Sequence, residues 1–249
     1  MINYQVENNT GIITLNRPDK RNALHPELVE EMKNKLEEIK KDSRVKVLII
    51  TGAGKSFCSG ADLSYLNELK NYSVIENEND SSALAQLFLN IYNFPKPTIA
   101  AVNGAAIAGG CGLAGVCDFV IADKTSAKFG YSEVKIGFLP AIVSIFLIKK
   151  IGAGKAKNLL ISGDIINAEQ ARTIGLADFI AVDVMAEAKT LSEKLSNNSG
   201  FSMSFTKEMI HNIAVLNVDE AVDYCIRLNT ISRSSTDFQK GLNSFLNKK

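Results

Sequence analysis

Residues 100–115 read AAVNGAAIAGGCGLAG, and this stretch decides which fold class the chain can adopt. Its first residues complete a strand predicted over 98–103, and the rest is a glycine-rich elbow. The same arrangement occurs earlier, where a predicted strand at 45–51 (VKVLIIT) is followed by GAGKSFCSGADL at 52–63. A β-branched, almost wholly apolar strand is typical of one that is covered on both faces. Both strands are therefore expected inside a sheet, each with a glycine-rich elbow at its end.

Strands and helices alternate on both sides of this stretch. Leu28, Met32, Leu36 and Ile39 follow one another at spacings of four, four and three, which predicts a helix over 26–41. Further strands are predicted at 12–15, 116–122 and 176–180, and further helices at 82–92, 142–150, 155–161 and 168–174. This alternation favours a parallel α/β core.

The pattern changes after about residue 183. Beyond it the sequence predicts only helices, at 185–195, 202–213, 219–231 and 236–246. We therefore expect two parts, an α/β core over residues 1–183 and a helical C-terminal region over residues 184–249. The polar stretch at 71–82 is expected to be a surface loop.

The overall composition excludes several classes of protein. The chain has 249 residues and a formal net charge of +1, so no general field attracts nucleic acid. Its apolar runs are shorter than the roughly 20 residues of a membrane span, and its first residues do not resemble a signal peptide. Four cysteines form no CxxC pair, and His25 and His211 belong to no paired ligand motif. We expect a soluble, cytoplasmic protein that has no metal and no nucleic-acid or membrane partner.

Both elbows contain fragments of nucleotide-binding motifs, and neither fragment is complete. Gly54-Lys55-Ser56 resembles the end of a P-loop, but Ile49 stands where that motif needs its first glycine. Residues 110–115 satisfy G-x-G-x-x-G. A dinucleotide site also needs a full helix, a second strand and an acidic residue about 20 positions further on. Here the next strand begins almost at once, so both nucleotide interpretations are rejected.

The elbows suit a different kind of site. Small side chains let a ligand approach the main chain closely, and the start of a helix presents unpaired amide N–H groups. Two elbows on neighbouring strands are able to aim two donors at one oxygen, as in an oxyanion hole for a carbonyl that becomes an enolate. Tight packing of helix on strand explains the same glycines equally well, so the residues alone leave both interpretations open.

A series of short motifs covers nearly the whole chain in one order. They are ITLNRP at 13–18, NAL at 22–24, FCSGADL at 57–63, AAVNG at 100–104, GGC at 109–111, CD at 117–118, FG at 129–130 and IGL at 174–176. With this series the chain resembles the enoyl-CoA hydratase/isomerase superfamily, the crotonases. The resemblance favours the oxyanion hole over simple packing.

The resemblance implies a crotonase-like spiral of ββα repeats, followed by a C-terminal helical region that assembles a homotrimer or a hexamer made of two trimers. It implies an acyl-CoA substrate and no separate cofactor, because coenzyme A is part of the substrate. The two oxyanion donors of the family fall on Ala61 and Gly109. Further family positions that contact the substrate fall on Lys20, Arg21, Ser59, Asp62, Leu63 and, in the C-terminal helix and often from a neighbouring subunit, on Phe245 and Lys248.

The expected proton carriers are incomplete. Hydratases of this family that use two glutamates have one shortly after the second elbow, where this chain has Gly112. The other glutamate is matched by Glu133, whose apolar neighbours are expected to raise its pKa toward neutrality and suit it to proton transfer. An exposed carboxylate at a helix start is the plainer interpretation of Glu133. Tyr131 fits a role in the acyl pocket and a role in packing equally well.

One carboxylate leaves two reactions open. It is able to move a proton between C2 and C4, which isomerises a 3-enoyl-CoA to a 2-enoyl-CoA. It is also able to serve both steps of hydration in turn. The stretch SEVKIGFLPA at 132–141 resembles bacterial methylglutaconyl-CoA hydratases, while residues 140–142 depart from a glycine-rich stretch common in the family. We therefore place hydration of a short or branched 2-enoyl-CoA first, isomerisation second, and a catalytically silent acyl-CoA- or RNA-binding protein third.

Overall fold

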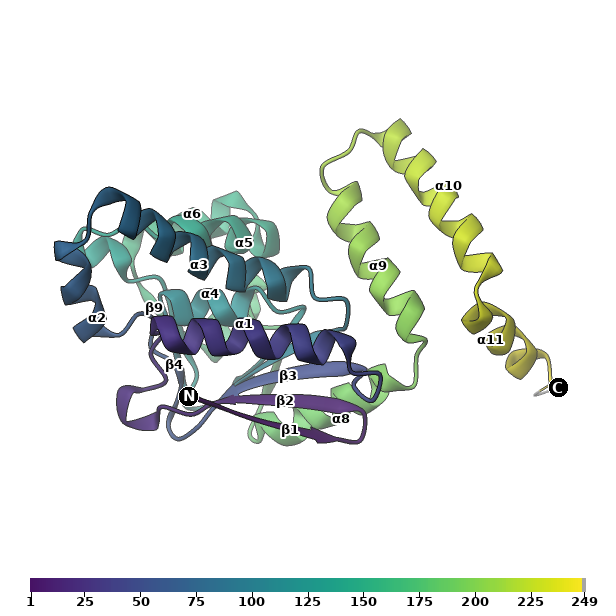
Figure 1. The fold of residues 1–249 in the computed structure, drawn as a ribbon, viewed down its shortest axis with the longest axis horizontal. Helices are drawn as coiled ribbons and strands as arrows, with labels where there is room; N and C mark the ends of the chain where they lie inside the picture. Colours follow the sequence, from purple (N-terminus) through teal and green to yellow (C-terminus); the bar gives the residue numbers. More distant parts are fainter. Residues whose placement is uncertain (248–249) are drawn as a thin grey trace.

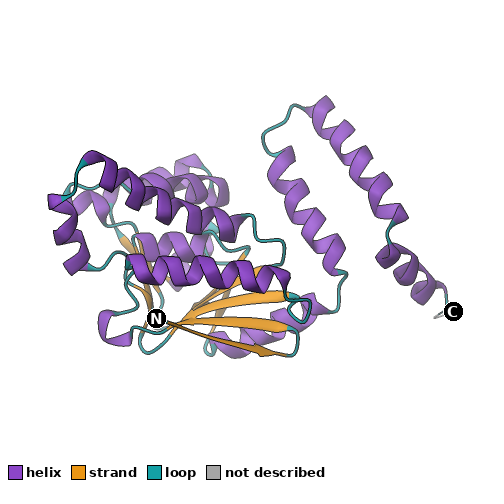
Figure 2. Cartoon of the chain, viewed as in Figure 1, coloured by secondary structure: helices purple, strands orange, loops and turns teal. Residues whose placement is uncertain are grey.

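Two β-sheets form the centre of the molecule in the computed structural model, which describes residues 1–247 with the side chain of Leu63 excepted (Figures 1 and 2). The larger sheet has the order β1 (Ile2–Glu7), β2 (Thr10–Leu15), β3 (Val47–Gly52), β5 (Thr98–Val102), β7 (Phe119–Asp123), β10 (Phe179–Ala181). The smaller has the order β4 (Ser56–Cys58), β6 (Ala105–Ile107), β8 (Lys128–Gly130), β9 (Ile165–Asn167). Apart from the antiparallel pairs β1–β2 and β8–β9, neighbouring strands are parallel.

In each successive pair of strands, the first strand belongs to the larger sheet and the second belongs to the smaller sheet. β3, β5 and β7 lie in the larger sheet, and the strand that follows each of them, β4, β6 or β8, lies in the smaller. A helix or helical turn comes after each pair. The chain thus winds as a spiral of ββα repeats, and the elbow that ends each short strand recurs at the edge of the smaller sheet.

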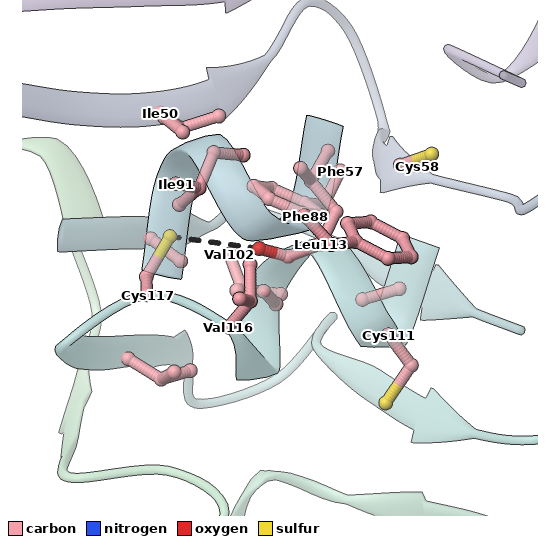
Figure 3. Packing of buried hydrophobic residues seen from close by; sticks show 14 of the residues in the cluster. Ile50, Phe57, Cys58, Phe88, Ile91, Val102, Cys111, Leu113, Val116 and Cys117 are labelled. Atoms are coloured by element: carbon pink, nitrogen blue, oxygen red, sulfur yellow. Dashed lines mark hydrogen bonds between the residues drawn. The ribbon is translucent and has the colours of Figure 1, made fainter. Parts of the chain in front are cut away.

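The two faces of the larger sheet are both covered, so every residue of β3 is buried. Leu48 and Ile50 belong to the main core between the sheets and their helices. Val47 and Ile49 point to the other face, where they pack with Val184 of α8. Figure 3 shows part of the main core, in which Cys58, Cys111 and Cys117 are packed among apolar side chains.

The helices surround this core. They are α1 (Pro26–Lys41), α2 (Leu63–Glu68), α3 (Val74–Tyr92), α4 (Gly109–Gly115), α5 (Ala141–Ile151), α6 (Ala153–Ser162), α7 (Ala168–Ile174), α8 (Val184–Ser196), α9 (Gly200–Ile213), α10 (Val218–Ser234) and α11 (Thr236–Leu246). Short 3-10 turns η1 (Pro18–Lys20), η2 (Leu69–Asn71) and η3 (Glu133–Ile136) connect some of them. No described helix is both long and apolar enough to cross a membrane.

The surface loop predicted over 71–82 is wrong, because α3 already begins at Val74. Ser73 and Glu76 form a reciprocal capping box there, in which each side chain bonds the other residue's backbone amide. The strand predicted at 116–122 begins later, at Phe119, because Val116 still caps the end of α4. The strand β1, which pairs with β2 across a turn at Asn8 and Asn9, was not predicted from the sequence.

The helices that follow residue 183 do not behave alike. α8 packs on the larger sheet, whereas α9, α10 and α11 extend away from the body (Figure 1). α9 is attached to the body by the ion pair of Lys207 with Asp118, at 2.8 Å, and by His211, whose ring stacks on Tyr92 at 3.8 Å. The part that separates from the body is therefore α9–α11.

Candidate active site

Two loops distant in sequence pair beside the first elbow. The amide of Ser59 donates to the carbonyl of Arg21 (3.1 Å), that of Leu24 to Gly60 (2.7 Å), and that of Asp62 to Leu24 (2.9 Å). Arg21, Ser59 and Asp62, three of the predicted substrate contacts, are thereby brought together. Lys20 and Arg21 are exposed at the rim, while Leu63 supplies the first residue of α2.

Asp62 is engaged within the protein. Its carboxylate accepts hydrogen bonds from the Ser64 amide (3.0 Å) and forms an ion pair with Arg17 (2.9 Å). The hydroxyl of Ser64, and Arg17 after it, lower the pKa of Asp62 to about 2, so the carboxylate is charged at neutral pH. Arg17 also donates to the carbonyl of Ala23 (2.7 Å). Asp62 therefore starts α2 and fastens the two loops to each other.

Beneath these loops, the buried side chain of Asn22 ties them to the preceding strand. It accepts from the amide of Arg17 (2.9 Å) and donates to the carbonyls of Ala53 (2.9 Å) and Ser56 (2.8 Å). The sequence indicated no role for Arg17 or Asn22, although both lie in the motifs that carry the resemblance. Their contact partners are up to 45 positions away, and no local pattern reveals such contacts.

The two proposed oxyanion donors follow neighbouring parallel strands of the smaller sheet. Ala61 comes after β4 and Gly109 after β6, and these strands are paired. A Cβ atom placed on Gly60 would lie 3.5 Å from the Gly109 nitrogen, so the two elbows approach each other closely. Between residues 1 and 247, neither amide donates to another protein group. Both are thus available to a ligand oxygen.

The residue before each proposed donor has a positive φ. Gly60 has φ 85° and Ala108 has φ 51° with ψ −124°. That region favours glycine, so the main chain at Ala108 is strained, as is common at functional sites. The Ala108 amide donates to Gly130 (2.7 Å), which helps to hold this conformation.

The start of α4 lies directly against the end of β4. A Cβ atom on Gly110 would meet the carbonyl oxygen of Cys58 at 2.0 Å, so only glycine fits there. Burial raises the pKa of Cys58 to about 12, and that of Cys111 likewise, so both thiols stay neutral. A neutral, enclosed thiol is a poor nucleophile, so the role of Cys58 is in packing.

Glu133 opens the 3-10 turn η3 and is buried, with 8% of its surface exposed. This excludes the plainer interpretation of an exposed carboxylate at a helix start. Its Oε2 atom is enclosed and has no hydrogen-bond partner, and burial raises the pKa of the carboxyl above its ordinary value. A carboxylate with a raised pKa and a free oxygen is suited to taking up and returning a proton.

The space beside Gly112 is filled by apolar side chains. A Cβ atom on this residue would lie 2.3 Å from Val143 Cγ1 and 3.4 Å from Phe88 Cζ. Tyr131 is fully buried in the core, and its hydroxyl has no hydrogen-bond partner. The sequence pattern did not indicate Val143 as a site residue.

The C-terminal positions lie far from these elbows within one chain. Phe245 is 71% exposed on α11, which lies at the opposite end of the molecule from α2 and β4 (Figure 1). Lys248 falls outside the described residues. Two surface clefts, of about 660 Å³ beside α6 and α7 and about 420 Å³ between α9 and the body, also lie away from the elbows. In the described part of the chain, no three His, Cys, Asp or Glu side chains are grouped as metal ligands would be.

Comparison with known proteins agrees with this geometry. The sequence model of the enoyl-CoA hydratase/isomerase family matches residues 5–249. The 2,3-dehydroadipyl-CoA hydratase of Escherichia coli K12 is 33% identical, over 96% of this chain and 92% of its own length. The crotonyl-CoA hydratase of Syntrophomonas wolfei is 32% identical, over 98% and 94%. The crystal structure of an enoyl-CoA hydratase from Shewanella pealeana superposes with a TM-score of 0.96 at 28% identity, covering 100% of this chain and 94% of that one. The chain belongs to the enoyl-CoA hydratase/isomerase family, and it has the crotonase fold.

Proposed function

We propose that this enzyme hydrates a 2-enoyl-CoA thioester, with Glu133 as its one proton carrier. The observation that carries this proposal is the Glu133 carboxylate, which is buried, has a free oxygen and has a raised pKa. The relatives named as hydratases of 2,3-dehydroadipyl-CoA and crotonyl-CoA support hydration as the reaction.

The main chain supplies the electrophilic half of the mechanism. The amides of Ala61 and Gly109 donate to the thioester oxygen and draw electrons from the conjugated double bond, which makes C3 electrophilic. Negative charge then collects on that oxygen when the enolate forms. A donor of this kind contributes about 10²–10³ in kcat, since it is aimed at the charge that develops in the transition state.

Glu133 supplies both proton transfers. Its carboxylate takes a proton from water while the water oxygen forms a bond to C3 and the π electrons move toward the thioester. The protonated carboxyl then returns the proton to C2, and the enolate collapses to the 3-hydroxyacyl thioester. One carboxylate is sufficient, because Glu133 is deprotonated again once the proton has been transferred to C2.

Contacts to the coenzyme A portion are proposed at the rim. Lys20 and Arg21 are exposed and form no ion pair in the part of the chain that the structure describes, so both cations are available to phosphate. Ser59 and Leu63 flank the Ala61 donor. Asp62 acts there by positioning the loop, because its carboxylate is already paired with Arg17.

The acyl group is proposed to be short or branched, of the methylglutaconyl-CoA kind. The resemblance of residues 132–141 to methylglutaconyl-CoA hydratases supports this class. Assays of 3-methylglutaconyl-CoA and crotonyl-CoA with the same preparation test it directly.

Isomerisation of a 3-enoyl-CoA is the second candidate function. It is favoured by one observation, the apolar filling of the space beside Gly112, which leaves Glu133 as the identified carboxylate of the site. Adding a 3-enoyl-CoA to the same assays separates the two reactions, since only a hydratase yields a 3-hydroxyacyl product.

Substitution of Glu133 by glutamine tests the central assignment. The variant should fold and bind coenzyme A as the wild type does, and its kcat for hydration should fall by about 10²–10⁴ because the amide cannot accept the proton. Glu169→Gln is a matched control, since Glu169 is an exposed carboxylate in the first turn of α7. Undiminished hydration by Glu133→Gln would remove the proton carrier from the proposal.

We also propose that the chain assembles as a trimer, or as a hexamer of two trimers. Exposed apolar side chains on the extension support an interface there, among them Val222, Ile226, Phe238 and Phe245. In such an assembly Phe245 reaches a neighbour's substrate rather than its own.

A further inference from the structure

Val143 of α5 packs against Gly112 of α4, the helix that begins at the proposed donor Gly109. Gly112 follows Gly109 by three residues on α4, and residues three apart lie on one face of a helix, about 5–6 Å from each other. The side chain of Val143 reaches residue 112 so closely that its Cγ1 lies 2.3 Å, and its Cβ 3.1 Å, from the place where a Cβ atom would begin. Val143 therefore covers α4 at Gly112, one turn after the proposed Gly109 donor.

The Val143 side chain has no room to withdraw. It is 4% exposed and packs in the main core. Behind the same space stands Phe88, whose ring meets that of Phe146 edge-on at a centroid distance of 6.0 Å. A β-branched side chain has few alternative rotamers in a helix, so the isopropyl group is a fixed wall.

We propose that Val143 is a specificity-determining residue, whose isopropyl group ends the acyl pocket beside Gly112 and makes the enzyme prefer short acyl chains to long ones. The inference rests on the proposed function, because it takes the thioester oxygen to lie on the amides of Ala61 and Gly109. With that oxygen fixed next to the first turn of α4, the acyl carbons pass the face that Val143 covers.

The test compares trans-2-butenoyl-CoA with trans-2-octenoyl-CoA as substrates of the full chain. Val143→Ala removes two methyl groups from the wall, and the ratio of kcat/KM for octenoyl to that for butenoyl should rise about tenfold or more, the usual effect of a methylene-sized change in an apolar pocket. Val116→Ala is the matched control. Val116 is also 4% exposed but lies at the other end of α4, so this variant should leave the ratio as in the wild type.

Gly112→Ala places an extra methyl group in the same space from the opposite side. It should lower the octenoyl-to-butenoyl ratio, and Gly112→Ala combined with Val143→Ala should bring the ratio back toward the wild-type value, since the two residues share one space. This pair keeps the proposal testable if Val143→Ala alone does not fold.

Binding separates failure of the inference from failure of the proposed function. Butyryl-CoA and octanoyl-CoA have no double bond to hydrate, so their binding is measured by calorimetric titration. In Val143→Ala the affinity for octanoyl-CoA should rise relative to that for butyryl-CoA. If the enzyme has no hydratase activity but Val143→Ala binds octanoyl-CoA more tightly, the proposed reaction is refuted and the role of Val143 in the acyl pocket is supported. An active hydratase whose kcat/KM ratio and binding preference are both unchanged in Val143→Ala would overturn the role of Val143.

Discussion

Backbone conformation at two residues controls the electrophilic half of the proposed site. Gly60 and Ala108 each precede a proposed donor, each has a positive φ, and a Cβ atom on Gly60 would lie 3.0 Å from that of Ala108. Ala108 bears a side chain in a conformation that costs about 1–3 kcal/mol outside glycine. The surrounding hydrogen bonds must offset this cost. The strained conformation of Ala108 orients the Gly109 amide.

Substitution of Gly60 by alanine is therefore expected to damage the hole selectively. Besides its φ of 85°, a Cβ atom there would meet the carbonyl oxygen of Ile107 at 2.9 Å, so the two elbows must move apart. Hydration should fall by about 10²-fold in kcat as the donors lose alignment. Steady-state kinetics with crotonyl-CoA, together with a thermal melt, measure the effect.

Gly175→Ala is the control for the backbone strain alone. Gly175 has φ 87°, and nothing lies within 4 Å of a Cβ atom placed on it. This variant should lose about 1–2 kcal/mol of unfolding free energy with little change in kcat. Equal loss of kcat in the two variants would show that strain, and not the contact between elbows, is responsible.

At the scale of single residues, the sequence predicted the motif positions and missed their supports. Glu133 is buried as its apolar neighbours suggested, and the loops with Arg21, Ser59 and Asp62 do come together. Val143 was out of reach, because its contact with Gly112 joins two helices and follows only from their packing. The roles of Ala61 and Gly109 as donors stay predictions, since only their free amides are seen.

At the scale of elements, the bounds of several helices were predicted and the polar start of another was not. α1, α7 and α11 begin and end at the predicted residues, and the apolar spacing that predicted α1 marks its buried face. The start of α3 was missed because its first turns are polar and exposed, so a capping box, and not an apolar face, marks them. The assignment of strands to two sheets could not be predicted from the pattern either, and the spiral came only from the family resemblance.

The attachment of α9 to the body should depend on pH. Burial, and after it the positive charge of Lys207, lower the pKa of His211, while Asp118 acts in the opposite sense and Lys149 in the same sense as Lys207. When the pKa of a histidine is lower in the folded protein than in the unfolded protein, the unfolded protein binds the proton more readily. The stability it contributes is therefore complete above its unfolded pKa of about 6.5 and is lost as the pH falls.

His211→Phe should reduce this loss, because phenylalanine still stacks on Tyr92 and does not titrate. Thermal melts from pH 8 to pH 5 measure the difference, which should appear below about pH 6.5. The chain has only one other histidine, and His25→Asn keeps an N-cap residue at the start of α1. The assignment of the pH dependence to His211 would be contradicted if His25→Asn reduced the loss of melting temperature at low pH and His211→Phe did not.

At the scale of the whole molecule, the extension α9–α11 leaves apolar surface uncovered, with Ile226 57% and Phe245 71% exposed. Ile226→Asp on α10 places a charge in the proposed interface and should convert the assembly to monomers in sedimentation velocity. If a neighbour's Phe245 contacts substrate, KM for the acyl-CoA should rise with dissociation. Asn158→Asp, at an exposed position on α6 of the body, should sediment as the wild type. A wild-type protein that is monomeric at assay concentration would refute the interface.

The placement of both proposed donors on the main chain has an evolutionary consequence. Successive turns of the spiral deliver Ala61 and Gly109 from the paired strands β4 and β6, about 4.8 Å apart as neighbouring strands are. No ordinary point mutation deletes an amide N–H, except one to proline. Point mutations at positions 112, 133 and 143 do change the groups that surround the acyl chain. A lineage with this scaffold is therefore able to exchange one proton-transfer chemistry or acyl group for another while activation of the thioester is inherited unchanged.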